Sequence, residues 1–194
     1  MKYNWNKFKT IEDKKIKYSD IIDQCIVKYI IYPILPIVVN FNLSANFITT
    51  LSLICGITSV LAIQLDNYFL GSFLFLLRYI LDCLDGCVAR LTDTTSSFGD
   101  IYDHCVDYFT FILFYISCFT LNFSPIFMII LHILLFCSIL HYTLIYRKIK
   151  KGIIYRITYW IQINEKLEKL FKFTKHTGTG LFTIFCTIGI LLHS

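Results

Sequence analysis

Charged residues are scarce in this 194-residue sequence. Asp, Glu, Lys and Arg make up 16% of the chain, whereas hydrophobic residues make up 56% and the mean hydropathy is +0.64. There is no internal repeat, low-complexity tract or Pro/Gly-rich linker. A composition this apolar excludes an ordinary soluble domain, so we expect an all-α, polytopic membrane helical bundle.

Paired cysteines are missing as well. Eight cysteines are scattered through apolar runs, and none forms a CxxC pair. Cys83 and Cys87 lie one helical turn apart, which is as compatible with packing as with metal binding. We therefore expect small buried hydrophobic side chains rather than disulfides or a zinc site.

Apolar runs predict the membrane-spanning helices, because about 20 apolar residues cross a bilayer. The predicted spans cover residues 46–65, 68–91, 98–121, 124–146 and 177–193. Ser44 is the expected N-cap of the first span. The last span is barely long enough, so we expect about five to six transmembrane helices within a catalytic domain at residues 43–194.

The segments before this domain have a different composition. Residues 1–18 contain six lysines and predict a cytosolic basic tail. Residues 19–42 are more apolar, but charges crowd their start and prolines interrupt their hydrophobic part; these residues are Asp20, Asp23, Lys28, Pro33 and Pro36. This pattern predicts an interfacial amphipathic helix that ends near Tyr32, with a kinked spanning helix as the alternative.

Positive charge is divided unevenly along the chain. Of 18 Lys and Arg residues, six lie in residues 1–18 and nine in residues 147–175, while the connections at residues 66–67 and 122–123 carry none. Because cytoplasmic loops are enriched in Lys and Arg, the amino terminus is expected to be cytosolic, together with the loop at residues 92–97. In a eukaryotic host, we expect an endomembrane such as the endoplasmic reticulum.

Four aspartates lie within the predicted apolar spans, where ionised side chains are unfavourable. Asp82 and Asp85 share one stripe of a helix, Asp103 and Asp107 share a stripe of the next, and an antiparallel hairpin matches them in depth. An ionised side chain at membrane depth costs ~2.5–3.5 kcal/mol, so four would cost on the order of 10–14 kcal/mol without compensation. The cluster therefore predicts two Mg²⁺ or Mn²⁺ ions bound by all four carboxylates, with loop or helix-cap aspartates as the alternative.

The aspartates belong to a longer motif: DxxDG, two residues, AR, eight residues, G, three residues, D, three residues, D. Its fixed positions are Asp82, Asp85, Gly86, Ala89, Arg90, Gly99, Asp103 and Asp107. This motif resembles the signature of the CDP-alcohol phosphotransferase family, which are integral membrane enzymes. The resemblance implies transfer of a phosphoalcohol or phosphatidyl group from a CDP-linked donor to an alcohol, with release of CMP.

The resemblance also implies a role for each residue. Asp82, Asp85 and Asp103 are the principal metal ligands, and Asp107 contacts one metal and acts as the general base. Substrate is bound by Asn46, Thr49, Gly86, Ala89, Arg90 and Gly99. Close helix packing by the glycines, snorkelling by Arg90 and helix capping by Asn46 are the alternatives. We expect Arg78 to pair with Asp82, four residues later on the same helix.

The residues from Gly99 to His104 spell GDIYDH, which resembles a GELFDH string of the aminoalcohol branch. The resemblance implies that Asp100 and His104 deprotonate a diacylglycerol hydroxyl; a structural His at a helix start is the alternative. The expected reaction is therefore transfer of a choline- or ethanolamine-like phosphoalcohol to a diacylglycerol-type hydroxyl. The alternative is phosphatidyl transfer from CDP-diacylglycerol to inositol, serine or glycerol phosphate.

Other classes of function remain as alternatives. A transporter predicts acidic residues on several spans or an inverted repeat, and a non-catalytic membrane adaptor predicts a lost motif position; the sequence contains neither. The expected partners are a CDP-linked donor, a lipid or small-alcohol acceptor, the membrane and a second copy in a homodimer. No nucleic acid is expected.

Overall fold

The computed structural model describes residues 5, 8–9, 19–150, 152–158, 169 and 178–193, and the regular elements in these ranges are all helices. This confirms the all-α prediction. In chain order the helices are α2 (Ile21–Ile26), η1 (Val27–Ile31), α3 (Tyr32–Asn40), α4 (Ala45–Gln64), α5 (Tyr68–Leu91), α6 (Ser97–Thr120), α7 (Pro125–Ile149), α8 (Ile153–Ile157) and α10 (Thr179–Leu192).

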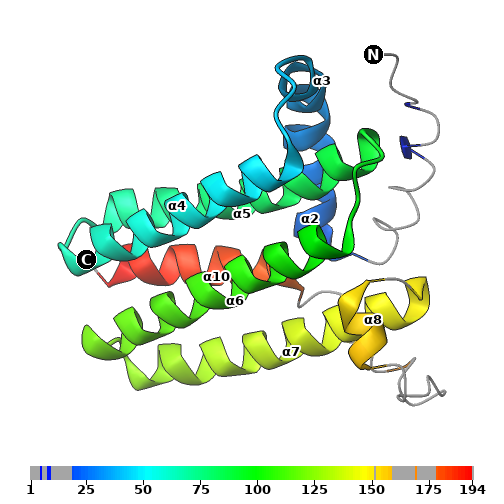
Figure 1. Cartoon of the computed structure of the whole chain (residues 1–194). Helices are drawn as coiled ribbons and strands as arrows, with labels where there is room; N and C mark the ends of the chain where they lie inside the picture. Colours follow the sequence, from blue (N-terminus) through cyan, green and yellow to red (C-terminus); the bar gives the residue numbers. More distant parts are fainter. Residues whose placement is uncertain are drawn as a thin grey trace.

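Helices α4, α5, α6, α7 and α10 lie side by side with their axes roughly aligned (Figure 1). The loop at residues 92–96 joins α5 to α6 at one end of this bundle, which we call the motif end; α2 and α8 lie there too. The turns at residues 65–67 and 121–124 lie at the opposite end, which we call the far end. Helices α5 and α6 therefore run antiparallel, as their spacing predicted.

The helix boundaries follow from capping residues. Side chains at the N-caps of α4, α5, α6 and α7 each accept a hydrogen bond from the backbone N–H three residues later; they are Ser44, Asn67, Ser96 and Ser124. Residues with positive φ in the turns that follow the helices include Asp66, Asp93 and Asn122. Asn and Asp tolerate this left-handed conformation, so these positions end the helices. The first four predicted spans agree with α4 to α7 within about three residues.

Within the described residues, three helices are long and apolar enough to cross a membrane: Ile21–Asn40, Ala45–Gln64 and Pro125–Arg147. Helices α5 and α6 have 24 residues each, but their internal Asp and Arg residues lower their hydropathy. Helix α10 has 14 residues and is shorter than the predicted span at residues 177–193. Together with the exposed apolar side chains, these helices identify a membrane protein.

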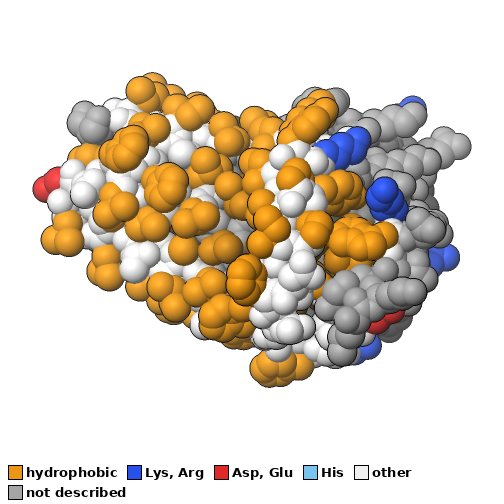
Figure 2. Space-filling view, turned by 90° about the horizontal axis from the view of Figure 1, so that it is seen from above, with side chains coloured by type: hydrophobic (Ala, Val, Ile, Leu, Met, Phe, Trp, Pro, Cys, Tyr) orange, Lys and Arg blue, Asp and Glu red, His pale blue; other side chains and the backbone are white. Residues whose placement is uncertain are grey.

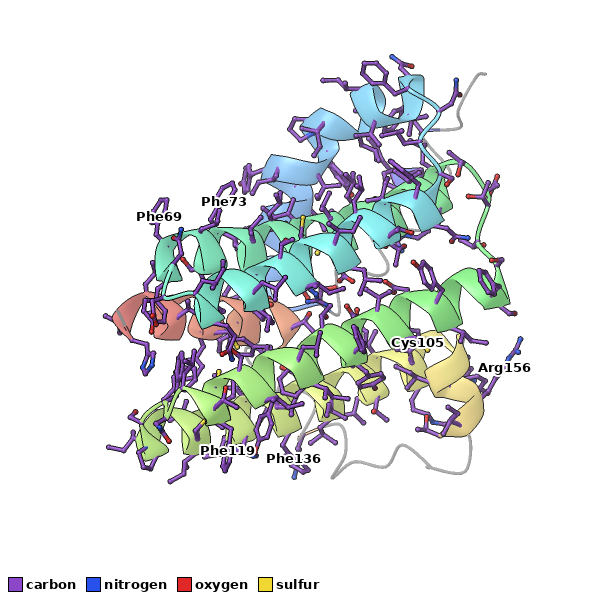
Figure 3. The ribbon with its side chains drawn as sticks, turned by 60° about the vertical axis from the view of Figure 1, so that its left-hand side comes forward. Phe69, Phe73, Cys105, Phe119, Phe136 and Arg156 are labelled. Atoms are coloured by element: carbon purple, nitrogen blue, oxygen red, sulfur yellow. The ribbon has the colours of Figure 1, made fainter. Side chains whose placement is uncertain are left out.

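The outer surface has the polarity of a protein in lipid. Hydrophobic side chains cover the face of the bundle in Figure 2, and Lys and Arg gather toward the motif end. Phe69, Phe73, Phe119 and Phe136 project away from the bundle (Figure 3) and are at least 55% exposed. Apolar side chains placed this way would contact acyl chains.

The amino-terminal helix corrects one expectation. It does not end near Tyr32 but continues to Asn40 through Pro33 and Pro36. The π-helical turn Val27–Ile31 precedes the prolines, and the Tyr32 N–H bonds to the Val27 carbonyl five residues back. A proline removes one backbone hydrogen bond, and a π turn can absorb that irregularity without ending the helix. The helix crosses the bundle at a steep angle (Figure 1). The predicted basic tail lies mostly outside the described residues, although Phe8 packs against this helix.

Small residues let α4 approach α5 closely. Ser59 Oγ donates to the Gly71 carbonyl at 2.7 Å, and Ser52 Oγ donates to the Arg78 carbonyl at 3.1 Å. Ser52, Gly56 and Ser59 recur at helical spacing on one face of α4. Small residues at this spacing are typical of helix interfaces in membranes. The contact brings the first turns of α4 beside the last turns of α5, where the motif lies.

Candidate active site

Three of the four motif carboxylates meet between α5 and α6. One oxygen each from Asp82, Asp103 and Asp107 lies within 4.8 Å of the other two. Asp82 comes from α5, and the other two come from successive turns of α6. The antiparallel hairpin therefore produces the convergence that the spacing predicted for these three residues.

Asp85 has a different partner. Its side chain is 4% exposed, and its Oδ2 accepts a hydrogen bond from Thr49 Oγ1 of α4 at 2.5 Å. Asp85 does not belong to the group of three convergent carboxylates in the described structure. Thr49, which was expected to bind substrate, thus holds the next acidic residue of the motif against α4.

Arg78 pairs across the hairpin rather than along its own helix. Its Nη2 donates to Asp107 Oδ1, and its Cδ packs beside Gly56 of α4. The expected pair with Asp82 was wrong. Helical side chains lean toward the N-terminus, so an Arg that precedes an Asp by four residues points away from it. One guanidinium therefore faces the three-carboxylate cluster from the bundle interior.

The remaining expected substrate contacts lie on α4, α5 and α6. Arg90 folds back over Gly86: a Cβ built there would lie 2.9 Å from Arg90 Nη1. Asn46 Oδ1 of α4 lies 3.3 Å from where a Cβ of Gly99 would stand on α6. Ala89 is half-buried on α5. Both glycines thus leave room for a polar side chain: Arg90 at Gly86 and Asn46 at Gly99. This space explains their small size in addition to close helix packing.

His104 does not form the expected pair with Asp100. Both ring nitrogens of His104 are buried, and within the described structure neither makes a hydrogen bond. The carboxylate oxygen nearest to Nδ1 in the described ion pairs is Asp103 Oδ2, at 3.8 Å. A neighbouring aromatic ring instead packs against the imidazole: that of Tyr146, at 5.9 Å between centroids.

Two tyrosines of α7 complete the site, and the sequence did not reveal them. Tyr146 lies within electrostatic range of Asp82, Asp100 and Asp103, and Tyr142 lies within range of Asp82 and Asp103. Their rings are 5.5 Å apart. Both belong to a span predicted from its lack of charged residues, and their i,i+4 spacing near its C-terminal end was the available signal.

A sequence model of CDP-alcohol phosphatidyltransferases matches residues 42–190. The chain belongs to this family. The reaction after which this family is named involves a CDP-linked donor and an alcohol acceptor. The described site, with its acidic hairpin, falls inside the matched residues.

Two curated relatives share a shorter region with the chain. They are the CDP-diacylglycerol–serine O-phosphatidyltransferases of Helicobacter pylori strains ATCC 700392/26695 and J99/ATCC 700824. Each is 38% identical over 66 residues, which cover 34% of this chain and 28% of the relative. The chain thus aligns with less than a third of the length of each of these relatives. No solved structure matches the chain.

The donor set fits a divalent cation that prefers oxygen. Three carboxylates supply three negative charges at one point, and Arg78 supplies one positive charge opposite them. Carboxylates without thiolate or imidazole suit Mg²⁺ or Mn²⁺ better than Zn²⁺. The cluster can therefore bind at least one such ion. The ion would offset the negative charge of the carboxylates that Arg78 does not neutralise.

Proposed function

We propose that this chain catalyses phosphatidyl transfer from CDP-diacylglycerol to a small hydroxyl compound, with release of CMP. The convergence of Asp82, Asp103 and Asp107 carries the proposal, because three carboxylates at one point would hold a cation that binds a diphosphate. Arg90 follows Asp82 on the same helix and folds back over Gly86. Both relatives are named for phosphatidyl transfer from CDP-diacylglycerol, which supports a phosphatidyl donor. The missing hydrogen bond between Asp100 and His104 weakens the main reason for a diacylglycerol acceptor.

In this proposal the aspartates bind the metal, and the other motif residues bind the donor. Asp82, Asp103 and Asp107 would hold Mg²⁺ or Mn²⁺, and we assign Asp85 to the same metal centre as a ligand held in place by Thr49. When bound, the ion neutralises the diphosphate of the donor. Arg90 contacts a donor phosphate with its planar guanidinium, and Gly86 leaves space for that phosphate near the backbone. Asn46, Thr49, Ala89 and Gly99 border the nucleotide.

The proton of the acceptor must leave as its oxygen attacks. The acceptor oxygen forms a bond to phosphorus, the bond from phosphorus to the CMP oxygen breaks, and the proton passes to a base. We assign this role to His104, whose ring nitrogens make no hydrogen bond in the described structure and which stands next to Asp103. Asp107 is the alternative base, and Asp100 would orient the imidazole in the substrate complex.

The GDIYDH string supports a second candidate, phosphoalcohol transfer from CDP-choline or CDP-ethanolamine to diacylglycerol. A donor assay separates the two reactions. Membranes containing the chain should release CMP from labelled CDP-diacylglycerol and place its label in a phospholipid when serine, inositol or glycerol phosphate is added. Label moving from CDP-choline or CDP-ethanolamine into lipid would favour the second candidate. Release from neither donor class, at confirmed expression, would refute both.

We also propose that the motif end faces the cytosol and that helix Ile21–Asn40 lies in the membrane interface there. The uneven Lys and Arg distribution and the steep crossing of this helix support both proposals. A cysteine at position 96 or 122, in a chain whose exposed Cys25 and Cys105 are replaced by serine, tests the orientation. Ser96→Cys should react with an impermeant reagent from the cytosolic side and Asn122→Cys from the other side. The reverse pattern would invert the orientation.

A further inference from the structure

A buried carboxylate outside the active site joins two helices that are far apart in the sequence. Asp20 is 1% exposed. Its Oδ1 accepts from the Asp23 N–H at 2.8 Å as the N-cap of α2, and its Oδ2 accepts from the Gly180 N–H at 2.9 Å in the first turn of α10. Because helix N-termini carry partial positive charge, this one carboxylate stabilises both helix starts.

Two glycines make room for this carboxylate. A Cβ at Gly178 would lie 2.3 Å from Asp20 Oδ2, and a Cβ at Gly180 would lie 2.8 Å from Asp20 Oδ1 and 2.7 Å from Ile22 Cβ. Distances this short exclude any larger residue unless the helices separate. Helix α2 is therefore docked on α10 at a fixed position.

The next acidic residue of α2 connects this junction to the active-site helix. Asp23 Oδ1 accepts a hydrogen bond from the Tyr79 hydroxyl of α5, and Thr179 Oγ1 of α10 lies 3.4 Å from both Asp23 oxygens. Tyr79 is 3% exposed and precedes Asp82 by three residues. Residues three apart share a helix face, so the contact at Tyr79 limits rotation of the turn that bears Asp82.

We propose that Asp23 and Tyr79 are positioning residues that hold Asp82 in register with Asp103 and Asp107. The amino-terminal helix is then part of the catalytic unit, although it precedes the family-matched residues 42–190. This inference rests on the proposed function in one respect, because it requires Asp82 to bind the metal. It adds a source of metal affinity that lies outside the motif.

Metal affinity distinguishes positioning from simple structural support. A contact that only stabilises the fold would lower the melting temperature and leave the affinity of the folded protein unchanged. A contact that aligns Asp82 would weaken cation binding in protein that is still folded. Outer-shell contacts of metal ligands typically contribute about 10–100-fold to affinity.

The test measures Mn²⁺ binding by electron paramagnetic resonance, with the full chain purified in detergent and no substrate present. Tyr79→Phe and Asp23→Ala should each weaken Mn²⁺ binding about tenfold. Both substitutions remove the same hydrogen bond, between Tyr79 and Asp23. The double variant should therefore bind Mn²⁺ no more weakly than the weaker of the two single variants. Asp23→Asn keeps an oxygen that accepts from Tyr79 and should retain most of the affinity.

The chain offers a matched control on the same helix. Tyr68 also donates to an aspartate, Asp66, at 2.9 Å, but at the far end of α5. Tyr68→Phe should therefore bind Mn²⁺ like the wild type.

Each outcome decides between the ideas. Asp82→Asn serves as the reference: if it binds Mn²⁺ normally, the proposed metal site itself is wrong. If Asp82→Asn loses Mn²⁺ while Tyr79→Phe binds normally, or if the double variant shows additive losses, only the positioning role is wrong. Should Tyr79→Phe fail to fold, the comparison of Asp23→Ala with Asp23→Asn gives the same decision.

Discussion

Polar side chains lie at both ends of the bundle, but those of the far end belong to neutral hydrogen-bonded pairs or to turns. There, the Gln64 amide donates to Ser117 Oγ at 2.9 Å and Thr120 Oγ1 at 3.0 Å. Asp66 is a turn residue with φ of 60°. At the motif end, Asp82, Asp103 and Asp107 instead lie inside helices, where no cap or turn requires an acid.

We propose that this difference separates structural acids from functional ones in a membrane helix. An aspartate at a helix end satisfies backbone groups and remains near water. An aspartate inside a membrane helix does neither, so it persists only where a cation or substrate compensates its charge. The position of a carboxylate relative to the helix ends is therefore more informative than the carboxylate count.

The largest effect should come from removing an internal carboxylate. Asp82→Asn or Asp103→Asn keeps the side-chain size but removes a proposed metal ligand, so CMP release should fall to the background of membranes without the chain. Asp66→Asn at the far end should keep wild-type activity. The assay is CMP release at matched expression. Normal turnover in either internal variant would remove the distinction between the two ends.

A slightly smaller effect is expected at His104. If His104 accepts the proton, His104→Ala should lower kcat by about 10²–10⁴-fold, the usual contribution of a positioned base. His132, whose Nε2 lies 3.0 Å from the Tyr115 hydroxyl in the other half of the bundle, provides the control substitution His132→Ala. Full activity in His104→Ala, with loss confined to Asp107→Asn, would transfer the role to Asp107.

The ion pair across the hairpin should affect stability as well as activity. Arg78→Met leaves the Asp107 carboxylate without its cation, which should cost on the order of 1–3 kcal/mol of folding free energy. The double variant Arg78→Met/Asp107→Asn should recover the melting temperature in detergent but not the activity. A melting temperature that is unchanged in Arg78→Met would show that the pair is not stabilising.

The smallest effect is expected at the support of Asp85. Thr49→Val removes the hydroxyl that donates to Asp85, and a hydrogen bond to a charged group contributes about 1.5–3 kcal/mol, so kcat should fall at least tenfold. Thr58→Val on the same helix is the control, because Thr58 Oγ1 donates to backbone carbonyls of α4, such as that of Ile54. Equal activities of the two variants would show that the hydrogen bond from Thr49 to Asp85 does not contribute to catalysis.

Sequence was sufficient for features set by local spacing. The lengths of the apolar runs and the residues Ser44, Asp66 and Asn122 predicted α4 to α7 closely. The convergence of Asp82, Asp103 and Asp107 followed from helical periodicity and a hairpin with short connections. These inferences needed only rules that act over a few turns.

Features that depend on a distant segment were not predictable in the same way. Thr49 is 36 residues from Asp85, and no periodicity links them. Arg78 had a local candidate four residues away, so its actual partner on α6 could be found only from the packed helices. Tyr142 and Tyr146 were inconspicuous because tyrosine is also ordinary near membrane interfaces. Pro33 and Pro36 were read as helix breakers, although the preceding π turn accommodates them.

The Arg78–Asp107 pair also has a consequence for how the chain enters the membrane. Neither α5 nor α6 is among the three described helices that are apolar enough to span a membrane by composition, since each carries charges in its interior. The pair places opposite charges of these two neighbours in contact. We expect α5 and α6 to leave the insertion machinery together as a hairpin, so that neither helix exposes its charge to lipid alone.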